Sequence, residues 1–233
     1  MKLSIVIPTL NEVDFLRDTI THLLKVAKEP DQLEIIIVDA GSTDGTLEST
    51  DSLPCQTFSQ PDFVFKKYQS LNFGLEKSQG EVILFLDADT LLPANFDQLI
   101  HKAFQNPKIV GGAFEFDFIK QDPLLWIVRT VNRIRYRIEQ SYYGDQAVFC
   151  RREVAIQIGG VPHKSLMESA YFCKKLRQEG KLHLIGDSVK TSPRRFIDHG
   201  VMKVLWFDFR MWIRFLLGMD IEHFGKKYWQ GEH

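Results

Sequence analysis

Short apolar runs alternate with amphipathic segments along the first half of the chain. The apolar runs contain no regular polar positions, which is typical of strands that are buried on both faces of a sheet. The segments between them repeat apolar residues with helical spacing or begin with residues that cap helices. This alternation predicts a parallel sheet that helices cover on both faces. We expect strands at 3–8, 33–38 and 82–86, and helices at 13–28, 43–52 and 67–77.

The second half has a less regular pattern. A run at 109–119 predicts a strand that bends at Gly111-Gly112. No repeat, low-complexity tract or long linker interrupts the sequence, so we expect one domain over residues 1–233 with a basic helical C-terminal part. Further strands are expected at 146–150, 182–185 and 189–191, and helices at 124–138, 168–179 and 203–217.

The composition, 44% hydrophobic and 25% charged residues, is that of a globular protein. The net charge of −1 predicts no nucleic-acid partner. The charge is unevenly distributed, however, because residues 1–116 hold 9 Lys and Arg against 17 Asp and Glu, whereas residues 117–233 hold 20 against 13. This asymmetry has three interpretations. A metal and an anion can meet between an acidic and a basic half, or a basic face can meet acidic lipid. The third is an ordinary charge dipole across a soluble protein.

The cysteines and the apolar runs bear on the cellular location. Three cysteines without a CxxC pair predict reduced thiols and neither a disulfide framework nor a zinc site. The first apolar run is too short for a signal peptide. No stretch approaches the roughly 18 apolar residues that a transmembrane helix needs. We therefore expect a cytoplasmic protein.

Candidate chemistry begins where the strand at 82–86 runs into Asp87-Ala88-Asp89. Two carboxylates at the carboxyl end of a strand lie where open α/β sheets bind ligands. Their oxygens suit Mg²⁺ or Mn²⁺ better than Zn²⁺, and a metal there can neutralise a nucleotide diphosphate. A solvated turn is the alternative interpretation.

The two preceding strands also end in polar residues. The first runs into Pro8-Thr9-Leu10-Asn11-Glu12, and the second into an Asp39-Ala40-Gly41-Ser42 loop. Asp39 can accept a hydrogen bond from a base N–H or can cap a turn. The GxGxxG and GxxxxGK[ST] motifs are absent, which argues against a dinucleotide-dependent dehydrogenase and a P-loop NTPase.

Taken together, several ordered segments resemble the family 2 glycosyltransferases. Order and spacing fit over nearly the whole chain, and further segments resemble a compact bacterial branch without transmembrane spans. The first set comprises SIVIPTLNE (4–12), IIIVDAGSTDGT (35–46), Asn72-x-Gly74, GEVILFLDADT (80–90) and VFCRREVAIQIGGVP (148–162). The second set comprises YGDQ (143–146), LME (166–168) and TSPRR (191–195).

The resemblance implies an α/β fold of the GT-A nucleotide-diphospho-sugar transferase type, with a mostly parallel central sheet flanked by helices. It places nucleotide-sugar binding in residues 1–116 and the acceptor side in 117–233. It implies that Asp89 binds the metal, Mg²⁺ or Mn²⁺, and that Asp39 contacts the base of the nucleotide. It also implies that the arginines of TSPRR bind the diphosphate. The implied nucleotide-sugar-binding residues are Pro8, Thr9, Glu12, Asp39, Ser42, Lys67, Asp87, Ala88, Arg194 and Arg195.

The sequence departs from the family pattern at two places. FKKYQSLNFG (65–74) lacks the glycine and arginine expected before the asparagine, which leaves Lys66 and Lys67 as alternatives near the phosphates. Glu168-Ser169 stands where the branch usually has Glu-Asp. We expect Glu168 to be the general base that deprotonates the acceptor hydroxyl, with Asp145 in reserve. A helix N-terminal acid is the alternative interpretation of Glu168.

A stripe of basic residues runs along each of the expected helices 124–138 and 203–217. The first helix has an apolar face opposite its arginines, which we expect to pack on the core or on a second subunit. The second is rich in Trp and Phe, so we expect 201–217 to contact a membrane surface or to form a homodimer. The apolar face comprises Leu124, Ile127, Val128, Val131, Ile134 and Ile138, and the basic residues are Arg129, Arg133 and Arg137 in the first helix and Lys203, Arg210 and Arg214 in the second.

The sequence therefore predicts a glycosyltransferase. It would move a sugar from a nucleoside diphosphate sugar to an acceptor hydroxyl, with inversion and with a divalent metal. The acceptor is unassigned, with a lipid-linked acceptor and a peripheral position at the inner membrane face as one option. A non-catalytic nucleotide-sugar-binding protein is the main alternative, because of Ser169 and the altered lysine loop, and a nucleotidyltransferase is a weaker one.

Overall fold

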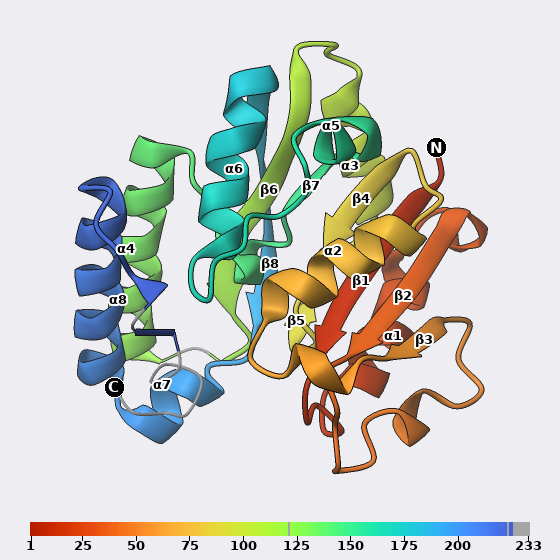
Figure 1. Cartoon of the computed structure of the whole chain (residues 1–233), viewed down its shortest axis with the longest axis horizontal. Coiled ribbons are helices and arrows are strands. Elements are labelled where there is room, and N and C mark those ends of the chain that lie inside the picture. Colours follow the sequence, from red (N-terminus) through yellow and green to blue (C-terminus); the bar gives the residue numbers. More distant parts are fainter. Residues whose placement is uncertain (121, 223, 226–233) are drawn as a thin grey trace.

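The computed structural model describes residues 1–120, 122–222 and 224–225, in which helices flank both faces of one eight-stranded sheet (Figure 1). The strands are β1 Leu3–Thr9, β2 Leu33–Asp39, β3 Gln56–Ser59, β4 Val82–Phe85, β5 Thr90–Leu91, β6 Ile109–Phe118, β7 Phe149–Arg151 and β8 Lys181–Thr191. The α-helices are α1 Leu16–Val26, α2 Lys67–Lys77, α3 Phe96–Phe104, α4 Pro123–Glu139, α5 Arg152–Gln157, α6 Glu168–Glu179, α7 Arg194–His199 and α8 Val201–Leu216. Single 3₁₀ turns are η1 Pro30–Gln32, η2 Glu48–Thr50, η3 Pro61–Phe63 and η4 Gly144–Gln146.

The sheet has the strand order β3-β2-β1-β4-β7-β6-β8-β5 and is mixed. Strands β3, β2, β1 and β4 are parallel, as expected, and so are β6 and β8. The expectation of a mostly parallel sheet is wrong beyond β4, because β7 inserts antiparallel between β4 and β6, and β5 pairs antiparallel with β8. A strand that is buried on both faces has the same apolar pattern in either direction, so the sequence did not reveal this reversal.

The continuous apolar runs follow from burial on both faces of the sheet. In β1, Ile5 and Ile7 belong to a core that includes residues of α1 and α3, whereas Val6 belongs to a core that includes residues of α2 and α6. All three side chains are fully buried. Successive residues of a strand point to opposite faces, so most positions of a strand covered on both sides are apolar, and a polar residue there needs a partner, as Ser4 of β1 has in Glu34 of β2.

The helix expected at 43–52 is wrong, because only the 3₁₀ turn η2 forms there. The Asp44 carboxylate accepts hydrogen bonds from the backbone N–H groups of Val13 (3.2 Å) and Thr46 (3.0 Å), and Gly45 has a φ of +90°. The segment is therefore fastened to the loop after β1 as an Asx turn instead of continuing as a helix.

The helices and strands in the second half of the chain also differ from those expected. The strands expected at 182–185 and 189–191 form one strand, β8, whose pairing with β6 shifts register between Phe114 and Glu115. The strand expected at 146–150 begins only at Phe149, after the turn η4. The elements β3, β5, α3, α5 and α7 were not expected; β5 has only two residues and α7 only six, too few to show a period.

The apolar face of α4 was expected to pack on the core or on a second subunit, and the structure excludes the core. Only Val128 of this face is buried, and the other five residues are exposed. The arginine stripe instead contacts β6, where Arg129 pairs with Asp117 (3.1 Å) and Arg137 pairs with Glu115 (2.5 Å). The reason is the buried Glu115 carboxylate, since an unpaired buried charge would cost several kcal/mol.

Gly112 allows β6 to lie between its two neighbours. A Cβ on this residue would lie 2.0 Å from the carbonyl oxygen of His183 in β8 and 2.7 Å from the ring of Phe149 in β7. Both neighbours are fixed within the sheet, so the backbone could not yield without disturbing the strand pairing.

We expect Gly112→Ala to destabilise the fold by about 1–3 kcal/mol, the usual cost of overpacking. Gly186→Ala in β8 is the matched control, because a Cβ there meets nothing within 4 Å. The midpoint of denaturant unfolding measures both changes. A Gly112→Ala variant as stable as Gly186→Ala would contradict the close approach of β7 and β8.

Candidate active site

The carboxyl ends of β1, β2 and β4 meet at one edge of the sheet (Figure 1). Open α/β sheets bind ligands at this edge. Nine residues that the sequence analysis assigned to nucleotide-sugar or metal binding line a cleft of about 530 Å³ there, which we call the first cleft. They are Pro8, Thr9, Glu12, Lys67, Asp87, Ala88, Asp89, Arg194 and Arg195.

The other two predicted binding residues, Asp39 and Ser42, lie in the loop after β2. The Asp39 side chain is only 1% exposed and accepts hydrogen bonds from Thr9 Oγ1 (3.2 Å), from the Ser42 hydroxyl and from the N–H groups of Gly41 and Ser42 (both 2.9 Å). A carboxylate has about four acceptor sites, so these bonds occupy them. The assignment of Asp39 to a nucleotide base stays a prediction and requires the loop to release one of these bonds.

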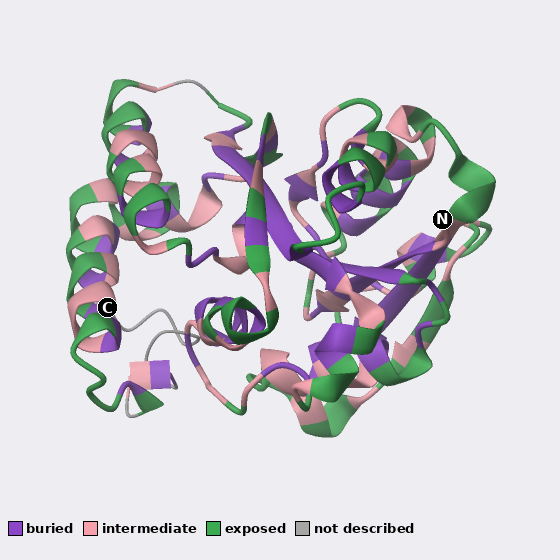
Figure 2. Ribbon diagram, turned by 90° about the horizontal axis from the view of Figure 1, so that it is seen from above, coloured by how far each residue is buried: buried purple, intermediate pink, exposed green. Residues whose placement is uncertain are grey.

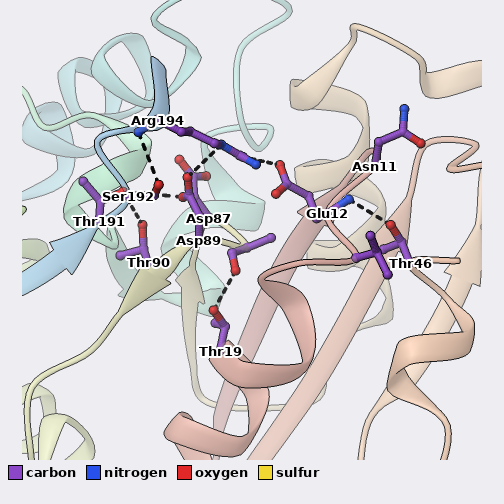
Figure 3. Close-up of polar contacts among 12 residues, drawn as sticks. Asn11, Glu12, Thr19, Thr46, Asp87, Asp89, Thr90, Thr191, Ser192 and Arg194 are labelled. Atoms are coloured by element: carbon purple, nitrogen blue, oxygen red, sulfur yellow. Dashed lines mark hydrogen bonds and ion pairs between the residues drawn. The ribbon is translucent and has the colours of Figure 1, made fainter. Parts of the chain in front are cut away.

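The loops after β1 and β2 are joined by hydrogen bonds between side chains and backbone. Asn11, which has a φ of +56°, donates its N–H to Ser42 Oγ (2.8 Å) and accepts from the N–H of Thr43 (3.0 Å). The N–H of Glu12 donates to Thr46 Oγ1 (2.8 Å) (Figure 3). These bonds fix the backbone of Glu12, whose side chain enters the first cleft.

Asp89 is positioned by the antiparallel pair of β5 and β8. The hydroxyls of Thr90 and Thr191 are 3.0 Å apart, and the N–H of Ser192 donates to the Asp89 carbonyl oxygen (3.2 Å). Both threonines are buried. This pairing brings the Asp-x-Asp segment of the acidic half against the TSPRR segment of the basic half.

Arg194 bridges two carboxylates across the first cleft. Its guanidinium lies 2.5 Å from Glu12 Oε1 and 3.3 Å from Asp89 Oδ2, and Figure 3 shows the side chain extending from one to the other. It also lies over the ring of Phe15, at 4.7 Å from the centroid. The second carboxylate oxygen of Glu12 is buried and has no hydrogen-bond partner among the described residues. A buried acceptor in this state is suited to a donor group of a ligand.

Lys67 and Asp87 form a second ion pair, with Nζ 2.5 Å from Oδ1. Lys67 Nζ also lies 3.8 Å from Glu168 Oε1, so one ammonium lies between two carboxylates. The absence of a side chain at Gly144 makes room for this pair, because a Cβ there would lie 2.7 Å from Nζ and 3.0 Å from Asp87 Oδ2. Of the two alternative lysines, Lys67 thus reaches the carboxylates, while Lys66 donates to the carbonyl of Asp62 (3.2 Å).

A second cleft of about 210 Å³ adjoins the first, and both predicted bases, Asp145 and Glu168, line it. Asp145 lies in the turn η4, and Glu168 is the first residue of α6. The two clefts have five lining residues in common, so they meet at the carboxylates that follow β4. The shared residues are Lys67, Asp87, Asp89, Ser192 and Arg195.

Burial makes several of these acids weaker. It raises the pKa of Asp145 to about 7, with a further contribution from Asp87, and it raises the pKa of Glu168 against the effect of Lys67. Burial and the neighbouring Asp87 likewise raise the pKa of Asp89 to about 6, although Arg194 opposes the shift. Carboxylates with a raised pKa near neutrality are suited to accepting a proton.

Sequence reasoning missed contacts between distant elements at the second cleft. Asp208 of α8 lines this cleft and pairs with Arg195 (2.5 Å). Tyr143 also lines it, and the guanidinium of the buried Arg135 lies 3.5 Å from the centroid of the Tyr143 ring. The one signal for Asp208 is that it is the single acid in an otherwise basic, aromatic helix. Tyr143 belongs to the YGDQ segment (143–146), which the resemblance singled out without giving Tyr143 a role. Arg135 has no signal, since nothing local indicates that α4 and the turn η4 touch.

The donor atoms partly fit a divalent metal. The described residues contain no cluster of three His, Cys, Asp or Glu that could hold one alone. Mg²⁺-type ions are nevertheless usually held by one or two carboxylates and the phosphates of the substrate. Asp89 and the adjacent Asp87 supply such oxygens, and burial, followed by the charge of Asp87, raises the pKa of Asp89.

Comparison with known proteins agrees with this geometry. The family model described as glycosyl transferase family 2 matches residues 4–159. An uncharacterized glycosyltransferase of Nostoc sp. is 32% identical over 123 residues, which cover 51% of this chain and 38% of the relative. The chain therefore spans about two fifths of the length of that relative.

Two solved structures have a similar fold. A mannosyltransferase from Pyrobaculum calidifontis in complex with GDP-Man and Mn²⁺ is 21% identical with a TM-score of 0.61, over 80% of this chain and 55% of that one. Glucosyl-3-phosphoglycerate synthase from Mycobacterium tuberculosis, in complex with Mn²⁺, UDP and glucosyl-3-phosphoglycerate, is 17% identical with a TM-score of 0.66, over 94% and 81%. At these identities the likeness concerns the fold alone.

The pKa of Asp145 predicts a pH-dependent stability. The folded protein binds the proton of the Asp145 carboxyl more tightly than the unfolded chain does. The contribution of this proton to the free energy of unfolding is therefore fully present below about pH 3.8 and is lost as the pH rises through about 7. Asp145→Asn should therefore match wild type near pH 4 and exceed its free energy of unfolding by about 2 kcal/mol at pH 8, a value reduced for partial exposure.

Denaturant unfolding at the two pH values measures this difference. Asp187→Asn, at an exposed aspartate of β8, is the control and should have the same small effect at both. A difference between Asp145→Asn and wild type that does not grow with pH would contradict the buried, charge-crowded environment of Asp145.

Proposed function

This chain belongs to glycosyl transferase family 2, and we propose that it transfers a sugar from a nucleoside diphosphate sugar to a hydroxyl group of an acceptor. One observation carries the proposal. The first cleft holds the residues suited to a nucleotide diphosphate, the second holds two carboxylic acids suited to proton transfer, and the clefts meet at Asp87 and Asp89. The scissile bond would lie where they meet.

On the donor side, the proposal gives the diphosphate to Arg194, with Lys67 nearby. A guanidinium binds phosphate oxygens with two parallel N–H groups, and Arg194 already faces the first cleft. Glu12 would accept a hydrogen bond from the donor through its unpartnered oxygen. Asp39 would fix the loop that carries Ser42, and the nucleotide base of the donor would lie against that loop.

Asp89, with Asp87 beside it, would hold Mg²⁺ or Mn²⁺ together with phosphate oxygens. When bound, the metal would offset the negative charge on the departing diphosphate. The presence of Mn²⁺ in both solved structures supports this assignment.

On the acceptor side, Glu168 is the proposed general base. Its carboxylate takes the proton of the acceptor hydroxyl as that oxygen bonds to the anomeric carbon and the bond from this carbon to the diphosphate breaks, which inverts the configuration. The buried Ser169, which stands where an acid was expected, donates a hydrogen bond to Glu168 Oε1 (3.3 Å). Ser169 would thus support the carboxylate of Glu168, and Asp145 remains the second candidate for the base.

The loss of an acid at position 169 also motivates a second candidate function. A non-catalytic nucleotide-sugar-binding protein would keep the first cleft and lack turnover. Residues 201–217 have two proposed partners, a membrane surface that carries a lipid-linked acceptor and a second copy of the chain. Within the ranges that the structure describes, no helix has the length and apolar content needed to cross a bilayer.

We expect Asp89→Ala to abolish Mn²⁺-dependent binding of a nucleoside diphosphate while the protein stays folded. A thermal-shift screen of nucleoside diphosphates with Mn²⁺ first identifies the base, because a ligand that binds only the folded state raises the melting temperature. Calorimetric titration then compares wild type, Asp89→Ala and Asp187→Ala, an exposed control. Equal affinity and equal Mn²⁺ dependence in all three would remove the metal assignment.

Glu168→Gln should leave donor affinity within a few-fold of wild type and lower turnover about a hundredfold or more, the scale expected for losing a general base. Release of nucleoside diphosphate from the donor, by transfer or by hydrolysis, provides the measurement. If Asp145→Asn stops turnover and Glu168→Gln does not, Asp145 is the base. If wild type binds a donor and never cleaves any, the non-catalytic function is correct.

A further inference from the structure

Charges on β6 set the rotation of α4. Glu115 is buried and accepts a hydrogen bond from Tyr136, and it pairs with Arg133 (3.3 Å) and Arg137 (2.5 Å). One turn towards the N-terminus of α4, Arg129 pairs with Asp117 (3.1 Å). These contacts hold the arginine stripe against the sheet, so the apolar stripe of α4 cannot turn towards the core.

The apolar stripe of α4 is consequently in solvent. Ile134 is 58% exposed and Ile138 is 73% exposed, and Leu124, Ile127 and Val131 continue the stripe along the helix. Their spacing of three and four residues places them on one side of the helix. Such a stripe normally meets another apolar surface.

Helix α8 lies beside α4 (Figure 1), and exposed residues lie along both helices (Figure 2). Helix α8 also presents apolar residues to solvent. Its inner side is buried through Val204, Phe207, Met211 and Phe215. Its outer side exposes Met202, Trp206, Phe209 and Leu216, with the Trp206 and Phe209 rings stacked.

The exposed apolar residues are concentrated on these two helices. Among the described residues, 18 large apolar side chains are exposed, and ten of them belong to α4 and α8. Isolated exposed apolar residues need no explanation, but a concentration of this kind marks an interaction surface. We call this surface, the exposed apolar residues of α4 and α8, the α4–α8 face.

The charges at the α4–α8 face are basic. Lys203 and Arg210 are exposed beside the apolar residues of α8. The two acids of these helices are engaged elsewhere, since Asp208 pairs with Arg195 and Glu139 is partly buried. An apolar surface bordered by cations is complementary to an anionic bilayer, with Trp at the level of the headgroups. A symmetric contact between two copies would instead bring two basic borders together.

The inner sides of the same helices form part of the second cleft. Asn132 of α4 and Phe207, Asp208 and Met211 of α8 line it together with Glu168. A bilayer on the outer side of the helices would therefore lie one helix diameter, about 10 Å, from the second cleft.

We propose that the α4–α8 face docks on an anionic lipid bilayer and holds the second cleft at the headgroup layer, where it receives an acceptor hydroxyl carried by a lipid. The docking part is independent of catalysis, whereas the acceptor part rests on the proposed function. The occupant is the bilayer surface itself, bound through apolar insertion and attraction to anionic headgroups.

Sedimentation with phosphatidylcholine vesicles, with and without phosphatidylglycerol, tests the docking in the absence of nucleotide. The full chain should sediment with the anionic vesicles at low salt and be released at high salt, because salt screens exposed charges. Ile134→Glu combined with Trp206→Glu should lower the partition coefficient at least about tenfold. Ile156→Glu is the matched control, because Ile156 is 51% exposed on α5.

Charge reversal tests the basic border separately. Lys203→Glu with Arg210→Glu should lower partitioning about thirtyfold or more, since each basic residue near an anionic surface contributes a factor of about five. Lys28→Glu with Lys108→Glu reverses two exposed lysines outside α4 and α8 and should leave partitioning within a few-fold of wild type.

Two results would overturn the proposal. One is a wild type that stays in the supernatant at low salt. The other is a stable dimer, seen by light scattering, that Ile134→Glu with Trp206→Glu converts to a monomer, since the α4–α8 face would then be a subunit interface. Nucleoside diphosphate binding in vesicle-free buffer separates membrane docking from the proposed sugar transfer. If this binding fails, the proposed function is removed, and vesicle binding is unaffected.

Discussion

The candidate site depends on the pairing of β5 with β8. These strands share only two residue pairs. They nevertheless join the segment that follows β4 to a segment about a hundred positions later in the chain. The pairing puts Asp89 beside Ser192 and lets Arg194 reach both Asp89 and Glu12. Without it, nothing would hold Arg194 against the carboxylates at the strand ends, or Ser192 and Arg195 where the two clefts meet.

The electrostatics of the site follow from this crowding. Glu12, Asp87 and Asp89 come together at one sheet edge, as parallel strands require, and Arg194 and Lys67 balance them only in part. The pKa of Asp89 is raised mainly by burial and then by the charge of Asp87, while Arg194 opposes the shift. This excess of carboxylates over cations is an arrangement that a divalent cation would stabilise, in line with the proposed binding of a metal and a nucleotide diphosphate.

Sequence reasoning found what is local and missed what is set by pairing across the chain. The strands before Thr9, Asp39 and Asp87 were predictable because each is an apolar run that ends in a polar group, and nine of the predicted residues line one cleft. The mixed sheet was not predictable, because β7 has the same apolar pattern in either direction. The rotation of α4 was also missed: helical periodicity identified its two stripes, but Glu115 and Asp117, on another element, decided which stripe faces inward.

The separation of the site residues along the chain has a consequence for the order of folding. The contact between Arg194 and Glu12 spans 182 positions, and that between Thr90 and Thr191 spans 101. Contacts that close such long loops have a large entropic cost and form after the local ones. During synthesis, β1, β2 and β4 can pair long before β8 leaves the ribosome, so the scaffold precedes the site. A chain interrupted before residue 190 would contain Glu12, Asp87, Asp89, Asp145 and Glu168 but neither Arg194 nor Arg195.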